Sequence, residues 1–317
     1  MAFSPKFFPT VLEHYNRIAA GEKTVLGAVK APGELGSAAI KAASLLGGDK
    51  AADALIALLG TSRSEEALAA LKCFNGDIAP KVTAALGRAK GDKLGDLLTL
   101  AGTRRIEGAA PVVFATIASG SALKEAALGA LEGVVREKDF SAVSALLDKA
   151  AEADVPQYCN ALMATIKTLD GSQKYEKVSA AIASASHPER FYTALASSNT
   201  NEALRDLEAL CDKSDAAALK AILLVDNGSA AHSVHKYFAR CDCYILRYVE
   251  LTGKYISDVD QKCLKYSEAL SQAKNPQTRN AILKAFRTAP TMKAFLEAGK
   301  CMEDPSLAYE AAHTARI

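Results

Sequence analysis

Apolar residues recur at helical spacing through most of the chain, in stretches separated by short turns. Between residues 34 and 46, for example, Leu35, Ala39, Ala43 and Leu46 fall at i, i+4, i+8 and i+11. Such a stripe predicts an amphipathic helix that must bury one face against a neighbour. The alternation of apolar and polar positions that predicts strands does not extend beyond a few residues. We therefore predict an all-α protein.

The helical pattern also repeats along the chain. Asn275 and Asp304 each stand before a proline, which places a capping side chain ahead of the first helical position, and these two openings lie about 30 residues apart. Between them Pro290 breaks the pattern, and residues 292–302 are predicted to form the antiparallel partner. Paired helices with a period of about 30 to 45 residues predict a right-handed α-solenoid, an α/α superhelix of stacked antiparallel helix pairs.

The domain organisation follows from the same rule. We predict one solenoid over residues 1–317, regular from about residue 33. Residues 227–260 depart from the repeat, since they contain two glycines, two histidines and a Cys-Asp-Cys sequence, and we predict an irregular, insertion-like region there. The pattern stops at Ile317 without the glycine or polar cap that usually ends a helix, so we expect the natural protein to be longer.

Composition narrows the class of partner. The chain has 38 Lys and Arg against 36 Asp and Glu, a formal net charge of +2, so neither a nucleic acid nor an anionic membrane surface is expected as a partner. Tryptophan is absent and no apolar run is long enough to cross a membrane. The first residues lack the pattern of a secretory signal. The adjacent Arg104 and Arg105 are interpreted as a solvated pair, with an anion-binding edge as the alternative.

Two stretches carry a resemblance to known families. Residues 121–149, with a serine before the acidic first turn, resemble HEAT-like repeats, the class that includes the phycobilisome-lyase type. Residues 282–286, followed by 289–291 and 303–312, are similar to helical-repeat segments of large exported bacterial proteins, in which such repeats precede a jelly-roll-like sugar-processing domain. The resemblance implies a HEAT-like solenoid in the periplasm or cell envelope. It transfers no catalytic residue, because the hydrolase-like chemistry of that family belongs to the sandwich domain.

Tyrosines concentrate in the irregular region. Four of the ten lie between residues 237 and 255, at Tyr237, Tyr244, Tyr248 and Tyr255, and Tyr266 follows closely. Tyrosine offers a large contact area together with a hydroxyl, so these four residues are the candidate binding residues. The alternative is that Tyr244 and Tyr248, one helical turn apart, fill a gap between helices that smaller side chains cannot fill.

The same region holds the candidates for a metal site. His232 and His235 stand at i and i+3 and are followed by Cys241 and Cys243, so a His/Cys zinc site is conceivable. The spacing argues against it, since structural zinc sites usually pair cysteines two to four residues apart. We predict packed or surface side chains here, with no metal and no cofactor.

No Gly-rich phosphate loop or serine nucleophile elbow occurs in the sequence. Our leading prediction is therefore a non-catalytic scaffold whose concave face or C-terminal end docks a protein partner or an adjacent domain of the same chain. One alternative is an enzyme similar to the helical-repeat DNA glycosylases, which the near-neutral charge and the absence of tryptophan disfavour. A lyase that attaches a pigment to a partner protein is a further alternative, which only the repeat class suggests.

Overall fold

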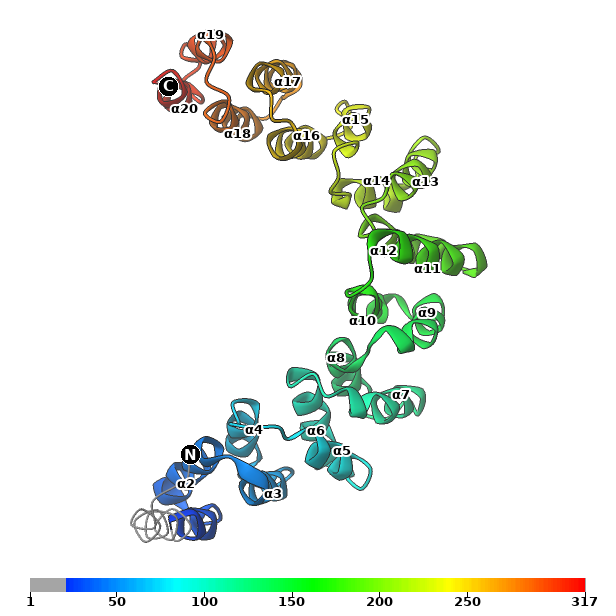
Figure 1. The fold of residues 1–317 in the computed structure, drawn as a ribbon, viewed down its shortest axis with the longest axis vertical. Coiled ribbons are helices and arrows are strands. Elements are labelled where there is room, and N and C mark those ends of the chain that lie inside the picture. Colours follow the sequence, from blue (N-terminus) through cyan, green and yellow to red (C-terminus); the bar gives the residue numbers. More distant parts are fainter. Residues whose placement is uncertain (1–20, 317) are drawn as a thin grey trace, which may run out of the picture. The chain divides into compact units, whose positions relative to one another are not determined.

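The computed structural model describes residues 21–316, which form helices joined by short turns (Figure 1). The described residues contain no strand, and neighbouring helices pack against each other, so the predicted all-α helical-repeat fold is confirmed. The chain divides into two compact units, with the boundary between Lys167 and Thr168. One continuous solenoid over residues 1–317 stays a prediction. The predicted absence of a secretory signal concerns residues outside the described part of the chain.

Between residues 33 and 167, the first unit is built from α-helices of 8 to 14 residues and three short 3-10 helices. Residues 21–28 are also helical. The elements that follow are α2 (Gly33–Leu46), α3 (Gly48–Leu58), α4 (Ser64–Lys72), α5 (Ala79–Leu86), α6 (Gly91–Thr103), η2 (Glu107–Ala109), α7 (Ala110–Ala118), α8 (Lys124–Val134), η3 (Glu137–Asp139), α9 (Phe140–Asp148), η4 (Glu152–Asp154) and α10 (Val155–Ile166).

The second unit continues with helix pairs, some of them short. Its elements are α11 (Gly171–Ser184), η5 (Pro188–Phe191), α12 (Tyr192–Ala196), α13 (Asn201–Cys211), α14 (Ala216–Ala221), η6 (Ile222–Leu224), α15 (Ala230–His235), α16 (Asp242–Tyr255), α17 (Val259–Gln272), α18 (Pro276–Phe286), α19 (Met292–Cys301) and α20 (Ala308–Thr314). Within the part of the chain that the structure describes, no helix is both long enough and apolar enough to cross a membrane.

Each unit arranges its helices in two rows (Figure 1). In the first unit the even-numbered helices α2 to α10 lie in one row, where each packs on the next, and the odd-numbered helices α3 to α9 lie in the other. The second unit repeats this arrangement, with the even-numbered helices α12 to α20 in one row and the odd-numbered helices α11 to α19 in the other. There α16 packs on α18 and α18 on α20, while α17 packs on α19 in the other row. These contacts bury mainly small and aliphatic residues, together with aromatic rings such as that of Phe286 on α18.

In the first unit, hydrogen bonds join the turns that follow α4, α6 and α8. The guanidinium group of Arg104, after α6, donates to the carbonyl oxygens of Phe74 (3.3 Å) and Gly76 (2.8 Å), after α4. Arg136, after α8, donates in the same way to the carbonyl oxygen of Arg105 (2.9 Å). The partners lie 28 to 31 residues apart, which is the repeat length. Arg104 therefore serves the stacking of repeats, because its donors bind carbonyl oxygens of the preceding turn.

The two proline openings behave differently in the structure. Asn275 caps α18 as expected, since its side chain accepts the backbone N–H of Gln277 at 2.8 Å. The helix predicted after Asp304 starts later, at Ala308. The Asp304 carboxylate instead accepts both the backbone N–H (2.9 Å) and the hydroxyl (2.6 Å) of Ser306. Asp side chains commonly accept hydrogen bonds from backbone groups two residues later in the chain. Here the turn closed in this way takes the place of the first helical turn.

Candidate functional site

Three of the four candidate tyrosines are buried. The side chains of Tyr244 and Tyr248, on α16, are 5% and 2% exposed, and that of Tyr237, which follows α15, is 5% exposed. Tyr255, at the C-terminal end of α16, keeps 41% of its surface exposed. The burial of Tyr244 and Tyr248 agrees with the packing alternative stated for these two residues, and Tyr237 is buried as well. Binding through Tyr255 stays a prediction.

The hydroxyl groups of the buried tyrosines have hydrogen-bond partners on neighbouring elements. Tyr244 donates to the carbonyl oxygen of Leu219 on α14 (2.8 Å), and Tyr248 donates to the carboxylate of Glu268 on α17 (3.0 Å). Tyr237 donates to the carboxylate of Asp212 (3.1 Å). Burial raises the pKa of Tyr244 to about 12, because the phenolate form would lose its hydration. These tyrosines therefore join neighbouring repeats as neutral donors.

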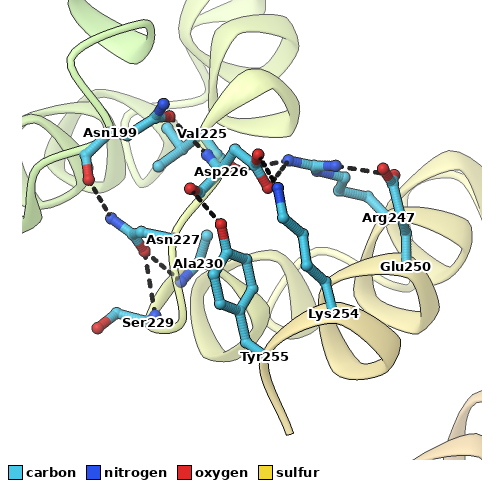
Figure 2. Close-up of polar contacts among 10 residues, drawn as sticks. All are labelled: Asn199, Val225, Asp226, Asn227, Ser229, Ala230, Arg247, Glu250, Lys254 and Tyr255. Carbon is cyan, nitrogen blue, oxygen red and sulfur yellow. Dashed lines mark hydrogen bonds and ion pairs between the residues drawn. The ribbon is translucent and has the colours of Figure 1, made fainter.

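Tyr255 belongs to a polar cluster around Asp226, in the turn between η6 and α15 (Figure 2). The Tyr255 hydroxyl donates to the backbone carbonyl oxygen of Asp226 at 2.7 Å. The carboxylate of Asp226 forms ion pairs with Arg247, at 3.3 Å, and with Lys254. The hydrogen bond from Lys254 is the main cause that lowers the pKa of the Asp226 carboxyl. Two cations thus hold this carboxylate ionised, and its charge is already compensated.

The same turn also contacts the repeat before it. The backbone N–H of Asp226 donates to the side-chain oxygen of Asn199 (2.7 Å), and the Asn227 side chain donates to the Asn199 carbonyl oxygen (2.9 Å). The side-chain oxygen of Asn227 accepts the backbone N–H of Ala230 at 2.9 Å, at the start of α15. Figure 2 shows these contacts converging on one turn. The cluster therefore continues, in the second unit, the turn-to-turn bonding of Arg104 and Arg136.

The four candidate metal ligands do not gather at one point. His235 lies against Glu268 of α17, with its Nε2 atom 2.7 Å from a carboxylate oxygen, while His232 is exposed on α15. The sulfur of Cys241 accepts the backbone N–H of Cys243 (3.1 Å) and caps α16. Nowhere in residues 21–316 do three His, Cys, Asp or Glu side chains gather closely enough to hold a metal ion.

Burial also affects the thiols. It raises the pKa of Cys211 to about 11, and the pKa of Cys301 lies above its usual value for the same reason. Thiols with raised pKa values are mostly protonated at neutral pH, and the protonated thiol is a poor nucleophile. These cysteines fit the interpretation of small buried hydrophobic residues.

A surface that the sequence analysis did not single out lies on α19. Met292, Phe295 and Leu296 are 73%, 51% and 55% exposed, although they are large and apolar. The opposite face of the same helix is buried through Ala294 and Ala298. The three residues stand at i, i+3 and i+4, so they form one stripe, which we call the α19 stripe. The signal was present in the sequence, because residues 292–302 carry apolar positions on more than one face of the predicted helix.

The α19 stripe borders a pocket of about 320 Å³. The pocket lies between the start of α19 and the end of α20, and its walls include Pro290, Met292, Phe295, Thr314 and Ala315. Met292 and Phe295 thus contribute to both the exposed stripe and the pocket wall. A pocket of this size, lined mainly by apolar groups, accommodates one or two aliphatic or aromatic side chains.

Comparison with known proteins finds no relative of this chain. Neither a protein-family model, nor a curated protein, nor a solved structure matches the chain.

Proposed function

We propose that this protein is a non-catalytic, protein-binding module of helical repeats, and that the α19 stripe is where its partner docks. The observation that carries the proposal is the exposure of Met292, Phe295 and Leu296 on a helix whose other face is already buried. Soluble proteins rarely leave several large apolar side chains together in water, and such patches commonly mark interaction surfaces. The partner is a second protein or an adjacent domain of the same chain.

The geometry of the stripe favours an amphipathic helix as the docking element. Apolar side chains at i, i+3 and i+4 are the anchors that pair helix with helix. Gly299 continues the stripe at i+7, and a Cβ atom built there would meet nothing within 4 Å, so a second helix has room to approach. On its other side α19 already packs against α17. A docked helix would extend this row by the same kind of contact.

Exposed lysines at the edge of the stripe favour a partner that has acidic residues at the matching positions. Lys293 is exposed beside the stripe, and so is Lys300, which pairs with Glu297 at 3.2 Å. Both lysines lie along one edge of the stripe when the helix is viewed down its axis. An incoming helix with apolar residues along its centre and acidic residues along the matching edge would complement this surface.

The proposal is tested by a pair of matched variants. Leu296→Asp places a charge in the stripe, and Leu264→Asp places the same charge on α17, where the native leucine is 54% exposed against 55% for Leu296. Neither change buries a charge, so both variants should fold as the wild type does, which circular dichroism checks. Partner capture from source lysate should be lost with Leu296→Asp and retained with Leu264→Asp. Equal capture by the two variants would contradict docking on the α19 stripe.

A heparin column separates this proposal from a nucleic-acid enzyme. A net charge of +2 predicts elution at low salt, since retention depends on a surface that neutralises several phosphate-like charges. Retention well above physiological salt would favour the alternative similar to helical-repeat DNA glycosylases.

A further inference from the structure

The Cys-Asp-Cys sequence at the start of α16 brings two thiols together at the surface. Cys241 is exposed, and its sulfur accepts the backbone N–H of Cys243 at 3.1 Å. Cys243 is half-buried, and burial together with a hydrogen bond between the two thiols raises its pKa to about 11. The Cys241 sulfur therefore lies against the backbone of Cys243, in the first turn of α16. The proposed binding function makes no use of the two thiols, and this inference does not rest on it.

We propose that Cys241 and Cys243 form a reactive dithiol, which a low-molecular-weight disulfide such as glutathione disulfide converts to an internal disulfide. Cys241 is the attacking residue because it is the exposed member of the pair, and a small disulfide in solution can reach an exposed thiol. Cys243 is the resolving residue because its backbone N–H lies against the Cys241 sulfur, with the nitrogen 3.1 Å from it, so the two residues are held side by side.

The exchange proceeds in two balanced steps. The Cys241 thiolate attacks one sulfur of glutathione disulfide, so a mixed disulfide forms on Cys241 and one glutathione leaves as a thiolate that takes up a proton. The raised pKa keeps most of the Cys243 thiol protonated, so the second step is slow, but the two residues are held side by side. The deprotonated fraction of Cys243 attacks the Cys241 sulfur, and the second glutathione leaves as a thiolate that takes up the released proton. The protein dithiol is thereby oxidised by two electrons, and glutathione disulfide is reduced to two molecules of glutathione.

The position of the dithiol connects its oxidation to the stacking of repeats. Asp242, between the two cysteines, accepts the backbone N–H of Asn275 at 2.9 Å, ahead of α18. Tyr244, in the same turn of α16, donates to Leu219 of α14. The internal disulfide withdraws the Cys241 sulfur from its capping role, and the turn that contacts both neighbouring repeats loses its cap. The oxidised chain should therefore unfold at a lower temperature than the reduced chain.

Trypsin provides an internal control in the same molecule. The fragment 241–247 holds both thiols of the pair, and the fragment 73–81 holds Cys73, an exposed cysteine that is the single thiol of its fragment. The reduced full-length chain is treated with glutathione disulfide, the remaining thiols are alkylated, and the digest is analysed by mass spectrometry. Fragment 241–247 should appear two hydrogen atoms lighter than its reduced form and without an alkyl group. Fragment 73–81 should carry glutathione.

Two variants assign the roles. Cys243→Ser keeps the Cys241 cap and should stop at a mixed disulfide on Cys241, while Cys241→Ser keeps a capping oxygen and should leave Cys243 to be alkylated. The proposal is overturned if wild-type fragment 241–247 carries glutathione or two alkyl groups when Cys73 is already modified. An unmodified Cys241 in Cys243→Ser overturns its assignment as the attacking residue. An unfolding temperature that does not rise when dithiothreitol is added to the oxidised chain overturns the link to α16.

Discussion

The contact between α6 and α8 depends on two glycines, and it offers the sharpest test of the packing. A Cβ atom added to Gly133, on α8, would lie 2.0 Å from the carbonyl oxygen of Gly102 on α6 and 2.7 Å from its carbonyl carbon. Ordinary contacts between such atoms are longer by about 1 Å or more. The obstructing atoms belong to the backbone, so no change of rotamer relieves the clash. In Gly133→Ala the two helices must therefore move apart.

Gly129, four residues earlier on the same helix, is the matched control. A Cβ atom there would meet nothing within 4 Å. Alanine favours a helix over glycine by about 0.8 to 1.0 kcal/mol, so Gly129→Ala should raise the free energy of unfolding by about that amount. Gly133→Ala gains the same helix propensity, but overpacking costs about 1 to 3 kcal/mol. A clash with backbone atoms belongs at the upper end of that range. The free energies of unfolding of the two variants should differ by about 2 to 3 kcal/mol.

The difference is large enough to measure by thermal unfolding. For a unit of this size, 1 kcal/mol corresponds to about 2 to 4 °C in the midpoint, so the two variants should differ by about 4 to 12 °C, with Gly133→Ala the lower. Urea unfolding followed by circular dichroism at 222 nm provides an independent value of the free energy difference. If Gly133→Ala is as stable as Gly129→Ala, the close approach of α6 and α8 is refuted.

Two further predictions concern a buried tyrosine and a strained turn. Because the pKa of Tyr244 is raised from its ordinary value of 10.0 to about 12 in the folded state, its contribution to stability is full below pH 10 and is lost as the pH rises towards 12. Tyr244→Phe should lower the free energy of unfolding by about 1 kcal/mol at neutral pH, because the hydrogen bond to Leu219 is lost. The variant should also show a smaller slope of unfolding free energy against pH between 10 and 12. An unchanged slope in urea titrations across that window would contradict the raised pKa of Tyr244. Arg105 has a φ of 55°, a left-handed conformation that costs a residue with a Cβ atom about 1 kcal/mol. Arg105→Gly should therefore be more stable to thermal unfolding than Arg105→Ala by about that amount, and equal stability of the two variants would show that the turn carries no such strain.

The sequence was sufficient for the helices and for the turns that local chemistry controls. The helix predicted over residues 292–302 has nearly the same bounds in the structure, Met292–Cys301, because Pro290 breaks the preceding pattern and Thr291 caps the first turn. The predicted start of a helix after Asn275 was also correct, because the Asn275 side chain caps α18. Asp304 shows the limit of this reasoning, since the same type of side chain can cap a helix or close a turn with Ser306.

The candidate site was predictable only in part. The spacing of Tyr244 and Tyr248 placed both residues on one face of a helix. Whether that face is buried against the next repeat depends on how α16 packs, which the spacing does not determine. The sequence offered no sign that Asp226 would lie between Arg247 and Lys254, because these partners are 21 and 28 residues away. Contacts over such distances depend on the register between repeats, which local pattern does not determine.

By itself, the sequence determined the all-α helical-repeat class and helix starts such as those of α18 and α19, because these depend on apolar periodicity, capping residues and prolines within a few positions of one another. The tertiary structure decided which apolar residues are buried and which remain exposed. Met292, Phe295 and Leu296 look like core residues in the sequence, yet they face outward, because Ala294 and Ala298 already fill the contact between α19 and the rest of its unit. Burial depends on the neighbours that a helix finds, and those neighbours come from other repeats.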